Sequence, residues 1–126
     1  LAYQSQVQAE KLAQRYTVSV ISGQPYFTSD DMFRDLMQGK FLVTVDNSNH
    51  PVWTESENVA FRIAHDILGH YSVLAPFTLQ GEREAYKAQA MTLSHTLHAP
   101  LFTEVVGQAS FYGKYGCFPQ QKAVIL

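Results

Sequence analysis

The stretch TESENVAFRIAHDILGH, residues 54–70, has the clearest helical pattern of the chain. Thr54 and Glu57 have the spacing of a capping box, in which each side chain satisfies a backbone N–H at the start of a helix. We expect the helix to end at Gly69, because a residue without a Cβ atom readily adopts the left-handed conformation that turns a chain. The apolar residues between these limits cover more than half of a helix circumference and predict a buried helix; they are Val59, Ala60, Phe61, Ile63, Ala64, Ile67 and Leu68.

The sequence on either side of this stretch predicts a mainly α (α+β) domain. Helical patterns cover residues 4–15, 29–38 and 81–93, and a further helix is expected from Pro100 through Glu104 to Tyr112. Short strand patterns at 17–21 and 41–45 give a small β element in the N-terminal part. We therefore expect a compact helical domain that comprises residues 1–126 as a single unit.

Composition and charge exclude several classes of function. Hydrophobic residues make up 46% of the 126 residues and charged residues 16%, which is typical of a soluble globular domain. A net charge of -2 gives no reason to bind nucleic acid or a membrane surface, and no apolar run reaches the roughly 18 to 20 residues that span a bilayer. The single cysteine, Cys117, fits a reducing compartment, so we expect a cytoplasmic protein. A small-molecule substrate and a homo-oligomer are both compatible with the sequence.

His65 and His70 are the first candidates for metal ligands. On a straight α-helix, residues five apart point about 140° away from each other. A helix that ends at Gly69 would let His70 turn back toward the face of His65, so that both imidazoles could reach one ion at about 2.0 to 2.2 Å. The alternative interpretation is that each histidine is a hydrogen-bonded group of the core or its rim.

Two carboxylates compete for the third ligand position. Glu104 lies within an apolar stretch, where an ionised carboxylate is costly unless it is paired or binds a cation; facing water or pairing with Arg62 is an equal alternative. Glu82 is expected in the first turn of a helix, where the dipole favours an acid without any metal. Gln108 lies one turn after Glu104 and could orient it. Asp66 is a candidate for an acceptor that supports a metal ligand through a hydrogen bond, or for a general base.

Residues 65–70 resemble the His-Glu-x-x-Gly-His motif of the aromatic amino acid hydroxylases. His65 and His70 match the two histidines that hold non-haem iron in that family, whereas Asp66 stands in place of the glutamate. The family uses a later glutamate as the third ligand, and Glu104 is the residue that this resemblance implies. The match covers six residues and one spaced acid, and no pterin-binding region can be assigned.

A second resemblance extends over roughly the last three fifths of the chain. It is to the spaced pattern of a group of proteins without an assigned activity, so it implies a pocket of polar residues but no substrate. The matching residues are His50-Pro51, Asn58, Phe61-Arg62, His65-Asp66, Gly69-His70, Phe77, Gly81-Glu82, Ala85-Tyr86, Thr103-Glu104, Gly107-Gln108 and Gln121-Lys122.

The preferred hypothesis is a 2-His-1-carboxylate site formed by His65, His70 and Glu104, with Glu82 as the competing or additional carboxylate. Such a set favours Fe(II) and also accepts Zn(II) or Mn(II), and its open positions would suit an oxygenase-like enzyme that acts on a small molecule. Tyr86, Phe111 and Tyr112 could line an aromatic pocket beside it; these three residues complete the candidate site.

Two alternatives stay open. The first is a non-catalytic helical module, in which the same polar residues form a buried hydrogen-bonded network. The second is a metal-assisted hydrolase. A zinc peptidase of the His-Glu-x-x-His type is disfavoured, because position 69 is glycine and position 66 is aspartate.

Overall fold

The computed structural model describes residues 1–46 and 52–107. Helices make up most of this part, and the two strands lie in its N-terminal portion, so the expected mainly α class is confirmed. In chain order the elements are α1 (Ala2–Arg15), β1 (Thr17–Ile21), α2 (Ser29–Met37), β2 (Lys40–Thr44), α3 (Glu55–Ala64), η1 (His65–Tyr71), α4 (Leu79–Ala90), η2 (His95–Leu97), α5 (His98–Phe102) and η3 (Thr103–Gly107).

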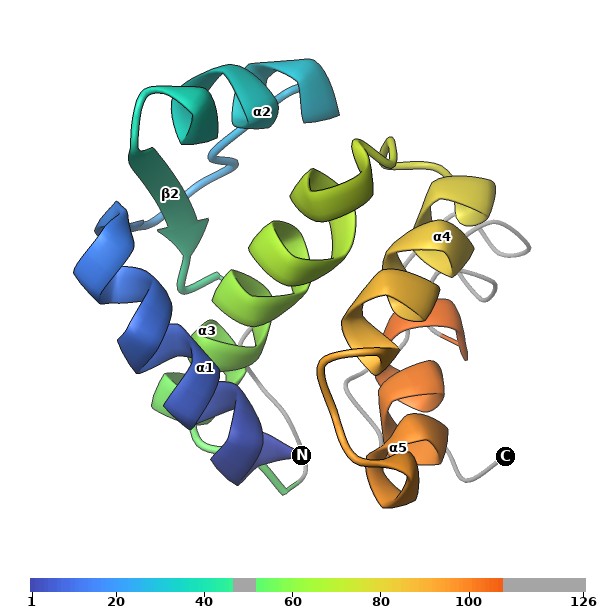
Figure 1. Cartoon of the computed structure of the whole chain (residues 1–126). Helices are drawn as coiled ribbons and strands as arrows, with labels where there is room; N and C mark the ends of the chain where they lie inside the picture. Colours follow the sequence, from blue (N-terminus) through green and yellow to red (C-terminus); the bar gives the residue numbers. More distant parts are fainter. Residues whose placement is uncertain (47–51, 108–126) are drawn as a thin grey trace.

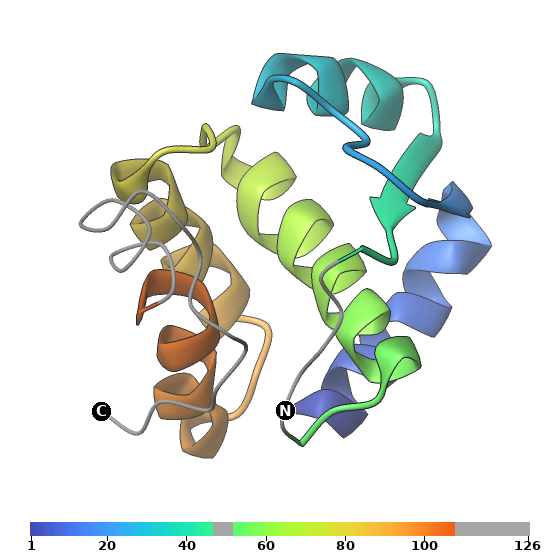
Figure 2. The same ribbon diagram turned by 180° about the vertical axis from the view of Figure 1, so that it is seen from behind.

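The central helix is α3, which continues directly into the π-helix η1. In both views α1 lies along one side of α3 and α4 lies along the other, with α5 below α4 (Figures 1 and 2). Helix α1 contacts α3, whereas α4 contacts mainly η1. A functional site on η1 is therefore placed next to α4.

The N-terminal part is a β-α-β unit. Strands β1 and β2 pair in parallel, with Thr17 opposite Lys40 and Ile21 opposite Thr44, and α2 forms the crossover between them. The cap of α2 is Thr28, whose side chain accepts a hydrogen bond from the Asp31 backbone N–H at 3.2 Å.

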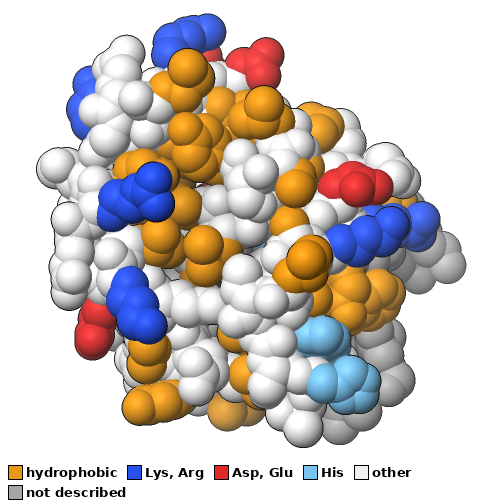
Figure 3. Space-filling view, viewed as in Figure 1, with side chains coloured by type: hydrophobic (Ala, Val, Ile, Leu, Met, Phe, Trp, Pro, Cys, Tyr) orange, Lys and Arg blue, Asp and Glu red, His pale blue; other side chains and the backbone are white. Residues whose placement is uncertain are grey.

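The surface has no extended area of one charge on the face seen in Figure 3. Lysine and arginine side chains stand apart from one another there, among hydrophobic and uncharged groups. Among the described residues, none of the helices has both the length and the apolar character that crossing a membrane requires.

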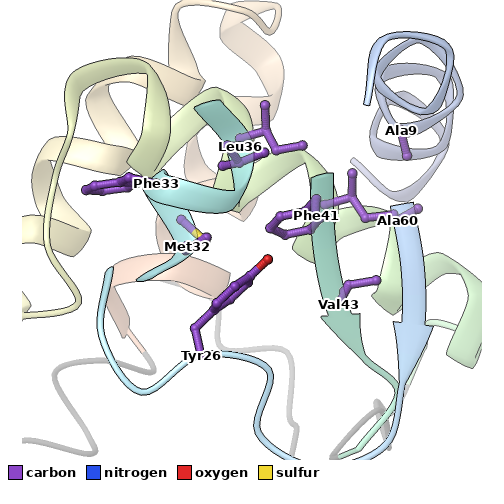
Figure 4. Close-up of a cluster of buried hydrophobic side chains, with 10 residues drawn as sticks. Ala9, Tyr26, Met32, Phe33, Leu36, Phe41, Val43 and Ala60 are labelled. Carbon is purple, nitrogen blue, oxygen red and sulfur yellow. The ribbon is translucent and has the colours of Figure 1, made fainter. Parts of the chain in front are cut away.

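The larger core cluster lies between α2, β2 and the central helix. Phe41 and Met32 are completely buried in it, and Tyr26 packs against Phe41 with the ring centroids 6.2 Å apart (Figure 4). The Tyr26 hydroxyl accepts from the Leu42 backbone N–H and donates to Asp35. Burial is the main reason that the pKa of Tyr26 rises to about 12. This cluster fixes one face of α3 and η1 and leaves the other face for α4.

The helix that starts at Thr54 does not end at Gly69. The capping box of Thr54 and Glu57 is present as expected, but the chain stays helical through η1, and Gly69 is not among the described glycines with a positive φ, which are Gly23 and Gly39. A Cβ atom on Gly69 would lie 3.1 Å from the Ala85 carbonyl oxygen. The absence of a side chain at Gly69 therefore allows η1 to pack closely against α4. The prediction that the chain turns at Gly69 is wrong.

Candidate metal site

The π-helix η1 brings His65 and His70 together. A π-helix closes its backbone hydrogen bonds between residues five apart, so residues with this spacing lie on successive turns of one face. The two imidazole rings meet edge to face, with centroids 4.7 Å apart and an interplanar angle of 81°. The spacing of five, which separates two side chains on an α-helix, thus gives convergence here because the helix is wider.

Glu82 supplies the carboxylate from the first turn of α4. Thr78 caps this helix by accepting a hydrogen bond from the Gly81 backbone N–H at 3.0 Å, and the next residue is Glu82. Glu82 Oε2 lies 3.0 Å from His65 Nε2 and 3.1 Å from His70 Nε2. Potential ligand atoms of these three residues all lie within 4.8 Å of one another, so a small shift of the side chains would let one metal ion contact all three.

The outer nitrogen of each imidazole is held by an acceptor. His70 Nδ1 lies 2.9 Å from the Ala75 carbonyl oxygen, and His65 Nδ1 lies 2.9 Å from Gln89 Oε1. A carbonyl oxygen only accepts, so each Nδ1 carries its hydrogen and each neutral ring presents a lone pair at Nε2. Metal-binding histidines are oriented in this way by partners of their second nitrogen.

The inner side of the site is therefore a set of acceptors that face each other. Two Nε2 lone pairs and an ionised carboxylate repel one another unless a cation lies between them. That cation is either a proton held on an imidazole or a metal ion. The arrangement can bind a divalent ion without any change of histidine tautomer.

The site is mostly buried and its charges are coupled. The exposed fraction of the side chain is 1% for His70, 13% for His65 and 21% for Glu82. Burial alone lowers the pKa of His65, but the hydrogen bond and charge of Glu82 outweigh it and raise that pKa to about 9. Burial alone raises the pKa of Glu82, but its interactions with His65 and His70 lower it to about 2. Without a metal, His65 is therefore protonated at neutral pH and faces an ionised Glu82.

Aromatic rings enclose the two imidazoles. Phe61 stacks on His65, with centroids 5.8 Å apart and an interplanar angle of 7°, and Phe77 meets His70 edge to face at 5.0 Å. Trp53 packs on Phe61 at 5.2 Å. The ring expected to line the site, Tyr86, packs against Phe102, and the other two, Phe111 and Tyr112, lie outside the described residues.

The carboxylate that joins the two histidines is Glu82, whereas the sequence favoured Glu104. Glu104 lies in the second π-helix, η3, and is not part of the group of close ligand atoms; it has an interaction of its own. Glu82 reaches the site because α4 packs directly against η1. The proposed partner of Glu104, Gln108, lies outside the described residues.

Asp66 orients neither imidazole, because both Nδ1 atoms have other partners. Gln89 and the Ala75 carbonyl group contact these atoms instead, and a supporting acceptor role of Asp66 stays a prediction. Burial raises the pKa of Asp66, while the charges of His65 and His70 oppose this rise. The role of general base stays a prediction for this residue.

Gln89 is the site residue that sequence reasoning missed. It is completely buried and lies seven residues after Glu82, two turns along the same face of α4. The sequence offered one indication of this role: Gln89 follows Glu82 by seven residues, so the two side chains share one face of the predicted helix. The Nε2 atom of Gln89 has no hydrogen-bond partner among the described residues, and the contact of Oε1 with His65 helps to offset the cost of burying this amide.

Replacing Gln89 with leucine is expected to weaken metal binding by about 10- to 100-fold, the usual effect of losing a group that orients a metal ligand. The His65 ring would lose the acceptor that fixes its tautomer and orientation. Isothermal titration with Zn(II) measures the change. Gln80→Leu is the matched control, because Gln80 is an exposed glutamine on the same helix. Equal affinities in the two variants would refute the orienting role.

Comparison with known proteins finds no match among family models, curated proteins or solved structures. The function proposed below therefore rests on the geometry of the site itself.

Proposed function

We propose that this chain binds one divalent metal ion through His65 Nε2, His70 Nε2 and the Glu82 carboxylate. The observation that carries the proposal is the pair of Nδ1 contacts to Gln89 and the Ala75 carbonyl group, which turn both Nε2 lone pairs toward the same carboxylate. Convergence of lone pairs in a mostly buried place favours a bound cation.

The ligand set favours a catalytic ion over a purely structural one. Structural zinc sites are usually closed by four protein ligands, whereas three ligands leave positions open for water, oxygen or a substrate. Glu82 is 21% exposed, so solvent reaches this side of the site. Two imidazoles and a carboxylate suit Fe(II) first, and Zn(II) or Mn(II) as well. We infer an oxygenase-like enzyme that acts on a small molecule.

The main alternative is a non-catalytic helical module. Its support is that all four ring nitrogens of His65 and His70 already have hydrogen-bond partners, so a protonated His65 could hold Glu82 without a metal. Such a network would fix the packing of η1 against α4.

Metal analysis separates these two functions. Protein produced without an affinity tag and purified without chelator is expected to contain a divalent ion, or to take one up from Fe(II) under argon, Zn(II) or Mn(II), at one ion per chain. Elemental analysis and equilibrium dialysis give the stoichiometry. A wild-type protein that is metal-free and cannot be reconstituted would support the hydrogen-bonded network instead.

A second assay addresses the chemistry. Oxygen consumption by the Fe(II) form, compared with hydrolysis of simple ester and phosphate substrates by the Zn(II) form, separates the oxygenase proposal from the metal-assisted hydrolase. Oxygen uptake that requires both Fe(II) and Glu82 is the expected result.

Metal affinity is expected to rise with pH. The pKa of His65 is about 9 without a metal, so at pH 7 the ion must displace the proton from Nε2. Below this pKa the apparent association constant should increase about tenfold for each pH unit, for example between pH 7 and 8. Calorimetry in buffers with different ionisation enthalpies counts the proton released. An affinity that stays constant over this range would contradict the expected proton displacement.

The metal-free protein should respond to pH in the opposite sense. A raised histidine pKa stabilises the fold fully below the unfolded value of 6.5, and this contribution is lost as the pH rises through about 9. Bound metal should remove this loss, because it takes the place of the proton.

A further inference from the structure

A second pair of histidines, His95 and His98, follows α4; the His95 side chain is exposed and the His98 side chain is half-buried. His95 belongs to η2, a 3₁₀-helix, and the His98 backbone N–H bonds to the His95 carbonyl group. Side chains three apart on a 3₁₀ turn eclipse one another. The two imidazole centroids are accordingly 5.5 Å apart, with the rings tilted by 55°. Figure 3 shows histidine side chains gathered on the surface over α5 and the segment before it.

Hydrogen bonds fix which nitrogen of His98 is available. His98 Nε2 donates to the Ala90 carbonyl oxygen at 2.8 Å and lies 3.3 Å from the Leu93 carbonyl oxygen. Because carbonyl groups only accept, the hydrogen of the neutral ring is at Nε2, and Nδ1 presents a lone pair. The contact resembles the support that metal-binding histidines receive at their second nitrogen.

The electrostatic position also favours a cation. Ala90 is the last residue of α4, so the pair lies at the end of that helix where the dipole is negative. His95 is exposed, and its ring can rotate to meet His98. Water molecules would occupy the remaining coordination positions of an ion held by these two histidines.

We propose that His95 and His98 form a second, surface-exposed site for a borderline transition-metal ion. Cu(II) should bind most tightly, followed by Ni(II) and Zn(II), because imidazole suits these ions and affinity follows that order. Mg²⁺ and Ca²⁺ should not bind, because they need oxygen ligands and no carboxylate of the described residues forms a close group with these two histidines. This site depends in no way on the one at Glu82.

The test uses untagged protein that carries Glu82→Gln, so that the inner site is weakened. Titration with Cu(II), followed by electron paramagnetic resonance, is expected to show one bound ion with nitrogen ligands. His95→Ala should abolish this signal, and since His95 is exposed the variant should fold normally. His98→Gln should abolish it too, while the glutamine amide retains a donor for the Ala90 carbonyl group.

Thr96→Ala is the matched control, because Thr96 lies between the two histidines and has no imidazole. It should bind Cu(II) like the parent. A His95→Ala protein that keeps the same copper signal overturns the proposal, as does a parent that binds none. Thermal unfolding gives an independent check: Ni(II) should raise the midpoint of the parent and of Thr96→Ala, but not of His95→Ala. These readouts do not depend on metal at Glu82, so failure of either site can be recognised separately.

Discussion

Replacing Glu82 with glutamine is expected to reduce metal affinity at the inner site by more than about a hundredfold, since loss of a group that only orients a ligand already costs about 10- to 100-fold. Glutamine keeps the length of the side chain but removes the charge that faces both Nε2 atoms. Two neutral imidazoles would remain, without an anionic ligand. Calorimetric titration with Zn(II) at pH 8 measures the loss.

Two other glutamates provide controls for this result. Glu104→Gln tests the ligand that the sequence favoured, and Glu84→Gln tests an acid two residues from Glu82 that bonds to Gln80 at the surface. Both variants should bind metal as the wild type does. Loss of metal in Glu104→Gln, with binding retained in Glu82→Gln, would reverse the assignment. Circular dichroism establishes that each variant is folded.

Replacing Gly81 with alanine is expected to destabilise the protein by about 3 kcal/mol, at the upper end of what overpacking usually costs. Within a helix this change normally stabilises by about 1 kcal/mol. Here a Cβ atom would lie 1.8 Å from the Pro76 carbonyl oxygen and 2.7 Å from the Pro76 carbonyl carbon. The loop before α4 must therefore move. Because Ala75 precedes Pro76 and holds His70, metal affinity should fall as well.

Urea unfolding of the metal-free protein measures this free energy without the contribution of a bound ion. Gln80→Ala is the neighbouring control, since Gln80 is exposed at the start of the same helix and should change stability little. A Gly81→Ala protein as stable as the wild type would mean that the loop adapts at no cost.

Local signals predicted much of the fold. The capping box at Thr54 marks the start of α3, and alternation of residue types marks β1 at its observed limits. Each of these features depends on residues that are close in sequence, where propensity and capping chemistry act directly. The parallel pairing of β1 with β2 depends on contacts distant in sequence and was not predicted.

The site was predicted in part, for the same reason. His65 and His70 stood out through their spacing, but the geometry assigned to Gly69 was wrong because local propensity does not distinguish an α-helix that ends from one that widens. The choice between Glu82 and Glu104 depended on which helix packs against η1. Glycine at 69 and alanine at 85 allow the close approach of α4 to η1, which brings Glu82 to the two histidines.

The widened turn of η1 has a consequence for how such a site could arise. A π-helical turn accommodates one residue more than an α-helical turn, so it is equivalent to a regular helix with a single insertion. Removing that residue would leave two histidines four apart, which also share one face of an α-helix. An ancestral helix with this shorter spacing could therefore gain a residue and keep its paired imidazoles. The wider turn takes up the added residue locally, so the side chains after it would keep their faces and the two imidazoles would still meet the carboxylate from α4.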